Sequence, residues 1–186
     1  RDTDRSRGLG DVYKRQAHVT LVNASVSVAP PMFVDVVNVT SAADMADVVK
    51  SRAAEQDIII MTAAVADFCP SHPADEKIKK NDSSYESVIE LERTEDILSY
   101  LGAHKAKGQL ICGFSMETQN MLENSKAKLV KKNADMIVAN NLKVAGAGFG
   151  TDTNVVTLIT ADDCTELEIM DKSCVAARIM DRLLQM

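Results

Sequence analysis

The chain has 186 residues, of which 46% are hydrophobic and 26% charged, and its net charge is −6. These values are typical of a soluble globular domain with a sizeable core. An acidic protein repels nucleic acid and anionic membranes, so any phosphate it binds must lie in a local basic pocket. No apolar run approaches the length of a membrane span. The four cysteines form no C-x-x-C pair and no zinc-ligand spacing, which favours a reducing, cytoplasmic location.

The first sixteen residues differ from the rest. The stretch 1–16 is polar, lacks an initiating methionine and any apolar period, and carries five basic against three acidic residues. It has no apolar segment that would make it a signal peptide. We interpret 1–16 as a non-native or disordered leader, with a natural disordered extension as the alternative. We expect one domain over 17–186.

The first half of this domain predicts strands alternating with helices. Ser41, followed by Asp44, predicts a capping box for a helix that ends near residue 55. The uninterrupted apolar run Ile58–Met61 is typical of a central parallel strand covered on both faces. The strands expected in this half are 18–22, 34–39, 58–61 and 87–92.

The second half continues the alternation. We expect helices over 95–105, 118–133 and 172–184, and strands over 110–114, 136–139, 155–160 and 166–170. The last two strands read as an added pair. This order predicts an α/β fold: a Rossmann-like, doubly wound and mostly parallel sheet.

Small side chains follow the strand at 58–61 and end in a carboxylate. In an open α/β sheet, ligands bind beyond the carboxyl ends of the strands. Ala63 and Ala64 would let a ligand approach the backbone, and Asp67 could hold a magnesium ion or a sugar hydroxyl. The alternative is an ordinary turn with a solvated aspartate.

Two groups of lysines could bind an anion. The run 77–80 places three lysines in four residues and could close over phosphates. Lys128 and Lys132 are four residues apart on one expected helix, where like charges cost about 0.2–0.5 kcal/mol unless an anion lies between them. We therefore expect that removing either lysine leaves the unliganded fold unharmed or slightly more stable. The alternative for both groups is a solvated surface. The glycines at 146, 148 and 150 do not form a dinucleotide-binding fingerprint.

Six ordered segments resemble one family. They read AAVADF, EKIKK, TEDIL, GFSMET, KKNADMIVAN and GAGFGTDTN, and they lie at 63–68, 76–80, 94–98, 113–118, 131–140 and 146–154. In this order they resemble phosphopantothenoylcysteine synthetase, the synthetase domain of the bacterial bifunctional coenzyme A enzyme. One departure is Glu95, which stands where that family's segment has proline.

The resemblance implies a role for individual residues. It makes Lys77 a catalytic residue on a loop that closes over the intermediate, and Asp67 a ligand of CTP together with Mg²⁺. The residues that it implies for CTP binding are Ala63, Ala64, Asp67, Lys77, Glu95, Asp96, Ile97, Leu98, Phe114, Lys128 and Lys132.

The resemblance also implies a reaction. CTP converts 4'-phosphopantothenate to an acyl-cytidylate, and L-cysteine then displaces CMP to give phosphopantothenoylcysteine. We expect a homodimer, fused to or associated with a flavin-dependent decarboxylase, and FMN only where that domain is present. The family's first strand-loop-helix unit has no counterpart in 1–16. We therefore expect the segment as given to bind CTP weakly and to form little product. The alternatives are a nicotinamide-dependent Rossmann reductase and a non-catalytic nucleotide-binding module.

Overall fold

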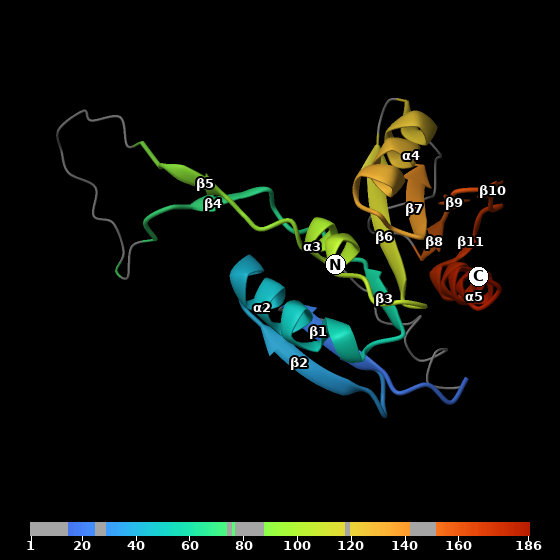
Figure 1. Cartoon of the computed structure of the whole chain (residues 1–186), viewed down its shortest axis with the longest axis horizontal. Coiled ribbons are helices and arrows are strands. Elements are labelled where there is room, and N and C mark those ends of the chain that lie inside the picture. The colour runs from blue at the N-terminus through green and yellow to red at the C-terminus, as the bar shows by residue number, and fades with distance from the viewer. Residues whose placement is uncertain (1–14, 25–28, 74–75, 77–87, 118–119, 142–151) are drawn as a thin grey trace.

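The computed structural model describes residues 15–24, 29–73, 76, 88–117, 120–141 and 152–186. Strands and helices alternate through most of this part of the chain (Figure 1). The strands are β1 (Thr20–Ala24), β2 (Asp35–Val39), β3 (Ile58–Met61), β4 (Phe68–Pro70), β5 (Leu91–Arg93), β6 (Leu110–Glu117), β7 (Met136–Asn141), β8 (Thr153–Asn154), β9 (Val156–Ile159), β10 (Cys164–Glu166) and β11 (Met170–Asp171). The helices are α2 (Ala42–Arg52), the 3₁₀ turn η1 (Ala53–Glu55), α3 (Ile97–Ala103), α4 (Met121–Lys131) and α5 (Lys172–Leu183).

The central sheet has the order β10-β9-β7-β6-β3 among the described strands. Strands β3, β6 and β7 are parallel, whereas β9 and β10 are antiparallel to their neighbours. The predicted mixed α/β fold with a mostly parallel central sheet is therefore confirmed.

Helices cover both faces of this sheet. On one face, α5 packs Val175, Ile179 and Leu183 against a buried cluster of β6, β7 and β9. On the other face, Ile111 of β6 joins residues of α2 and α3 in a second buried cluster. This arrangement follows from the alternation of side chains along a strand, which sends successive residues of β6 to opposite faces. Both faces of β6 are consequently buried.

Strand β3 is covered on both faces but lies at the edge of the sheet. Ile58 and Ile60 pack toward the α5 cluster, whereas Ile59 and Met61 pack toward the cluster of α2 and α3. The expected two-sided cover is confirmed. The expected central position is wrong among the described strands, because β3 pairs with β6 alone. Burial on two faces indicates helices on both sides of a strand, and it does not report how many neighbours that strand has.

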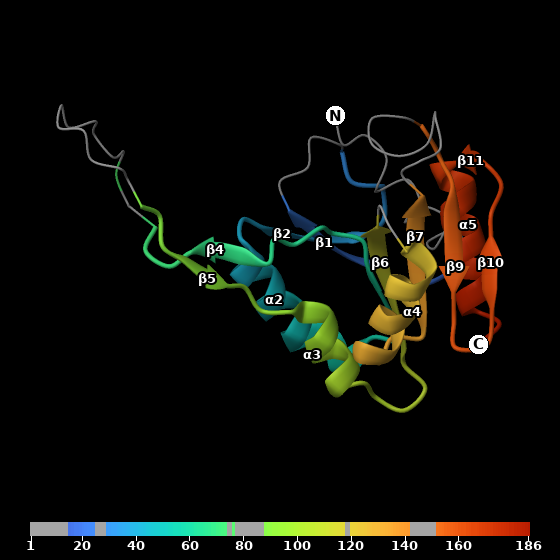
Figure 2. The same ribbon diagram turned by 90° about the horizontal axis from the view of Figure 1, so that it is seen from above.

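Three further strand pairs surround the central sheet. Strands β1 and β2 form a parallel pair beside α2. Strands β8 and β11 pair near the start of α5. Strands β4 and β5 form an antiparallel pair that projects from the body of the molecule, as both ribbon views show (Figures 1 and 2). We call residues 68–73 and 88–93 the arm.

The expected strand pair 155–160 and 166–170 is partly wrong. Strand β9 pairs with β10 at Cys164–Glu166, and Met170–Asp171 pairs with β8 instead. A tight turn sets this register, because Asp163 N donates to Thr160 Oγ1 at 3.1 Å and Thr160 N donates to the Asp163 carbonyl at 2.9 Å. The second strand thus begins directly after the turn, in an exposed stretch without an apolar pattern.

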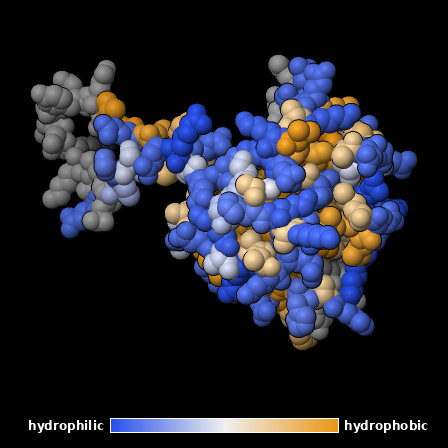
Figure 3. All heavy atoms as spheres, in the orientation of Figure 1, coloured by the Kyte–Doolittle hydropathy of each residue, from blue (hydrophilic) through white to orange (hydrophobic). Residues whose placement is uncertain are grey.

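The capping box at the start of α2 is confirmed. Asp44 N donates to Ser41 Oγ at 3.0 Å, and Ser41 N donates to Asp44 Oδ2 at 2.9 Å. None of the described helices is long and apolar enough to cross a membrane. Hydrophilic residues cover most of the face in the space-filling view, with smaller apolar patches between them (Figure 3). The boundary expected between residues 16 and 17 stays a prediction; Arg15 Nη1 lies 2.7 Å from Asp181 Oδ1 of α5.

Candidate functional site

The segment after β3 is tied to the segment before α3. Thr94 N donates to the Asp67 carbonyl at 3.0 Å, and the Thr94 hydroxyl donates to the Ala66 carbonyl. The register of the arm explains this contact, because Phe68 lies opposite Arg93 and so brings the residues before and after the pair together. Ala63, Ala64 and Asp67 are exposed at the carboxyl end of β3. This is the edge where the sequence places a ligand.

Helix α3 begins at this edge with a capped first turn. Asp96 is the N-cap, and its Oδ1 accepts a hydrogen bond from Ser99 N at 2.9 Å. Ile97 is buried. Leu98 approaches β6 at Gly113, where an added Cβ would lie 2.7 Å from Leu98 Cδ2. Glycine at 113 therefore allows α3 to pack closely on the sheet, and this packing holds residues 95–98 at its edge.

The two predicted lysines of α4 have protein partners. Lys132 Nζ forms an ion pair with the Asp96 carboxylate and lies 2.9 Å from Ser99 Oγ. Lys128 Nζ donates to the Phe114 carbonyl at 2.9 Å. The side chain of Lys132 is only 13% exposed. Both lysines therefore have protein partners, on β6 and at the start of α3, and neither is only a solvated charge on the helix surface.

These contacts also correct the expected effect of removing the lysines. The sequence suggested mutual repulsion, so that either loss would leave the unliganded fold unharmed or more stable. The Asp96 carboxylate offsets that repulsion at Lys132, and a carbonyl oxygen accepts from Lys128. Loss of Lys132 would leave Asp96 without its cation, which is destabilising.

Glu95 is held from the opposite side, by α2. Lys50 Nζ lies 2.8 Å and 3.0 Å from the two Glu95 carboxylate oxygens. The same ammonium lies 5.0 Å from the centre of the Tyr100 ring, which stacks on His104. The Glu95 carboxylate raises the pKa of the Lys50 ammonium above its usual value. Glu95 and Asp96 are therefore each paired with a lysine from a different helix.

The ring of Phe114 lies apart from this group. It packs against the cluster on the α5 face, whereas Leu98 packs on the opposite face of β6, at Gly113. Only the Phe114 carbonyl contacts the lysines, through Lys128. Lys77, the basic run 77–80 and the glycines at 146, 148 and 150 lie outside the described residues.

The electrostatics of the site centre on Asp96. Partial burial acts to raise the pKa of this carboxyl, but hydrogen bonds from Lys132 and from Ser99 N outweigh it and hold the pKa below its usual value. Among the described residues, no group of three His, Cys, Asp or Glu side chains could hold a metal ion. A single exposed carboxylate such as Asp67 suits a magnesium ion that also takes phosphate oxygens and water.

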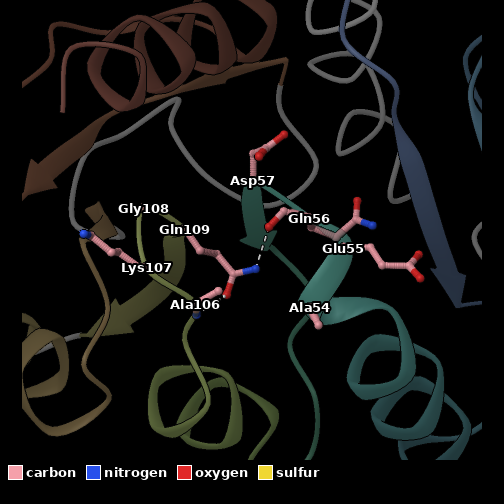
Figure 4. Close-up of a pocket in the computed structure, with 8 residues that line it drawn as sticks. All are labelled: Ala54, Glu55, Gln56, Asp57, Ala106, Lys107, Gly108 and Gln109. Carbon is pink, nitrogen blue, oxygen red and sulfur yellow. Dashed lines mark hydrogen bonds between the residues drawn. The ribbon is translucent and has the colours of Figure 1, made fainter.

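Two cavities lined by described residues lie away from this edge. One, of about 400 Å³, lies between 54–57 and 106–109, at the amino ends of β3 and β6 (Figure 4). Gln109 crosses it, donating from Nε2 to the carbonyls of Gln56 at 2.5 Å and Ala53 at 2.7 Å. The other, of about 500 Å³, is lined by residues that include the Lys105–Asp135 ion pair and Arg182. Since α/β sheets bind ligands at the carboxyl ends of their strands, we place the functional site at that edge rather than in either cavity.

Sequence reasoning missed three residues that shape the site: Lys50, Ser99 and Gly113. Asp96 stands directly before the apolar Ile97, and an aspartate in that place could have suggested a capped helix start to which Ser99 donates its backbone N. Lys50 carried no such signal, because its partner Glu95 lies 45 residues away in sequence.

A family comparison identifies the domain. The sequence model described as "DNA/pantothenate metabolism flavoprotein C-terminal domain" matches residues 10–186. The chain belongs to this family. Among curated relatives, it is 44% identical over 169 residues to the coenzyme A biosynthesis bifunctional protein CoaBC of Bacillus subtilis, covering 90% of the chain and 41% of that protein. It is also 44% identical over 170 residues to a cysteine/cysteine sulfinic acid decarboxylase from an unknown prokaryotic organism, covering 90% of the chain and 47% of that protein.

Two solved structures share the fold. The C-terminal domain of a CoaBC protein superposes with a TM-score of 0.79 at 38% identity, covering 97% of this chain and 81% of the other. A Cab2 mutant in complex with phosphopantothenate-cysteine superposes with a TM-score of 0.60 at 17% identity, covering 82% of this chain and 54% of the other, and shows likeness of fold alone. The chain spans less than half the length of the two curated relatives named above.

Proposed function

We propose that this domain carries the CTP-dependent phosphopantothenate–cysteine ligase activity of coenzyme A biosynthesis. The observation that carries the proposal is the meeting of three segments at one edge of the sheet: Ala66–Asp67, the capped start of α3, and Lys132 of α4. Each contains residues that the sequence assigned to CTP. The domain's family and its 44% identity to a CoaBC protein support the same pathway.

The reaction requires the site mainly to align the carboxylate with the α-phosphate and to neutralise the charge of the triphosphate. The 4'-phosphopantothenate carboxylate attacks the α-phosphate of CTP, which releases pyrophosphate, and the cysteine amine then displaces CMP. Lys128 and Lys132 would neutralise the triphosphate, and residues 95–98 would line the cytidine pocket. Asp67 would hold a magnesium ion, which supplies further positive charge beside the phosphates. Lys77 stays a proposed catalytic residue.

The deciding experiment measures nucleotide binding and product release together. With magnesium, CTP should raise the melting temperature of the domain more than ATP does. CTP, phosphopantothenate and cysteine together should release CMP and pyrophosphate, at a low rate from the segment as given. Lys128→Ala should weaken CTP binding, whereas Lys126→Ala, an exposed lysine on the same helix, should not. Equal stabilisation by ATP, or equal binding by both variants, would refute the proposal.

The decarboxylase relative favours a second candidate. If the domain itself decarboxylates cysteine or phosphopantothenoylcysteine, it should release carbon dioxide without consuming CTP. The same reaction mixtures, assayed for carbon dioxide, separate the two activities. A homodimer, a fused or associated flavin-dependent decarboxylase with FMN, and a cytoplasmic location remain part of the ligase proposal.

A further inference from the structure

The start of α3 is fastened from two sides by two different helices. Lys50 of α2 holds Glu95 through both carboxylate oxygens, at 2.8 Å and 3.0 Å. Lys132, at the end of α4, holds the neighbouring Asp96. Two consecutive carboxylates, Glu95 and Asp96, are thus each paired with a lysine, one from α2 and the other from the end of α4.

We propose that Lys50 is a positioning residue for the nucleotide site. Its ion pair with Glu95 holds residues 95–98 in place while Lys132 binds the triphosphate. This inference rests on the proposed function. A triphosphate that draws Lys132 away would leave Asp96 without its cation. The Lys50–Glu95 ion pair would then still hold this segment against α2.

The surroundings of Lys50 suit this role. Its side chain is only 27% exposed, and its ammonium lies 5.0 Å from the centre of the Tyr100 ring, on the same helix that Glu95 precedes. Lys50 therefore contacts both Glu95, which precedes the N-cap of α3, and Tyr100 inside α3. Proline has a ring that fixes its backbone angle φ, and Glu95 does not. The ion pair of Glu95 with Lys50 therefore restrains this segment where the backbone alone does not.

A double-mutant cycle tests the tie. Lys50→Met, Glu95→Gln and the combined variant are compared with the unaltered chain for CTP affinity by calorimetry. Each single change should weaken CTP binding about two- to fivefold, the range expected for a partly exposed ion pair. The combined variant should be no weaker than either single one. Lys107→Met, an exposed lysine at the opposite edge of the sheet, serves as the matched control and should leave affinity unchanged.

Hydrogen exchange separates this inference from the proposed function. In the nucleotide-free protein, the Ser99 amide, which donates to Asp96 Oδ1, should exchange faster in Lys50→Met than in Lys107→Met. If the unaltered chain binds no CTP, the ligase proposal fails, and the exchange rates still decide whether Lys50 orders this segment. Unchanged Ser99 exchange, or additive losses of CTP affinity in the combined variant, would overturn the role of Lys50.

Discussion

At the scale of single residues, charge placement decides how the site behaves. Asp96 caps α3 with one carboxylate oxygen and pairs with Lys132 through the other. Because the pKa of Asp96 is lowered in the folded state, its charge stabilises the fold at pH values above the ordinary carboxyl pKa of 3.8. That contribution is lost as the pH falls through the lowered pKa.

A pH series with Asp96→Asn tests this assignment. Asparagine is also a good N-cap, so the change removes the charge and keeps the cap. The variant should be less stable than the unaltered chain at pH 7, and the difference should shrink as the pH falls below about 4. Urea unfolding at pH values from 7 down to 2.5 measures it. A difference that stays constant over this range would contradict the ion pair with Lys132.

Phe33 stores backbone strain in an exposed turn before β2. Its φ is +66°, in the left-handed region, and its side chain is 70% exposed. Side chains make this region unfavourable by about 1–2 kcal/mol, whereas glycine adopts it freely. Phe33→Gly should therefore exceed Phe33→Ala in free energy of unfolding by about 0.5–1 kcal/mol after the entropy cost of glycine. Both changes remove the ring, so their difference reports on Cβ alone; equal stabilities of the two variants would contradict the strain.

At the scale of elements, single polar side chains join helices to strands. Gln109, just before β6, is 5% exposed and donates to the carbonyls of Ala53 and Gln56, at the ends of α2 and η1. Figure 4 shows the bond to Gln56. Asn133, after α4, donates to the Gly102 carbonyl of α3 at 2.7 Å. These partly buried bonds join the end of α2 to the segment before β6, and the segment after α4 to α3, and so they contribute to the packing of the helices.

Gln109→Glu should be strongly destabilising. The change keeps the shape but replaces a donor with a carboxylate that faces the carbonyls of Ala53 and Gln56. Leaving such buried groups without a donor costs about 1–3 kcal/mol, and a buried charge costs more. Chemical denaturation should show a loss of at least about 2 kcal/mol. Gln185→Glu makes the same change at an exposed position and should be nearly neutral. Similar losses of stability in both variants would argue against a structural role for the two bonds of Gln109.

At the scale of the whole molecule, the arm stands out because its strands pair only with each other among the described strands and project away from the central sheet. The arm projects from the body (Figure 1) and carries exposed apolar side chains (Figure 3). Those in the arm are Phe68, Val88, Ile89 and Leu91, with exposed fractions of 50%, 82%, 69% and 59%. Contiguous apolar residues on a projecting pair of strands are typical of a surface that another chain covers.

We therefore expect the arm to contribute to the proposed homodimer. Sedimentation velocity should give the mass of two chains, and the double change Val88→Lys with Ile89→Lys should shift the protein toward the mass of one chain. Val130→Lys alters a residue of α4 that is 80% exposed and should leave the mass unchanged. A single-chain mass for the unaltered protein, or an unaffected dimer in the double variant, would contradict this expectation.

Elements whose cause is local can be predicted from neighbouring residues. The Ser41–Asp44 capping box, the apolar run at 58–61 and the helix after residue 171 follow from neighbouring side chains, and the structure confirms all three. The α/β fold class follows from their order along the chain. The resemblance to a family of coenzyme A biosynthesis rested on ordered segments, and the match over 10–186 confirms the family.

Features that depend on residues far apart in sequence are visible only in the folded chain. The pairing of Lys50 with Glu95 and of Lys132 with Asp96, the edge position of β3 and the register of β9 with β10 are set by packing and turn geometry. The two lysines of α4 show the difference most clearly. Their spacing on one helix indicated repulsion, but Lys132 forms an ion pair with Asp96, a carboxylate 36 residues away in sequence. Periodicity reports on near neighbours, whereas charge pairing depends on which surfaces the folded chain brings into contact.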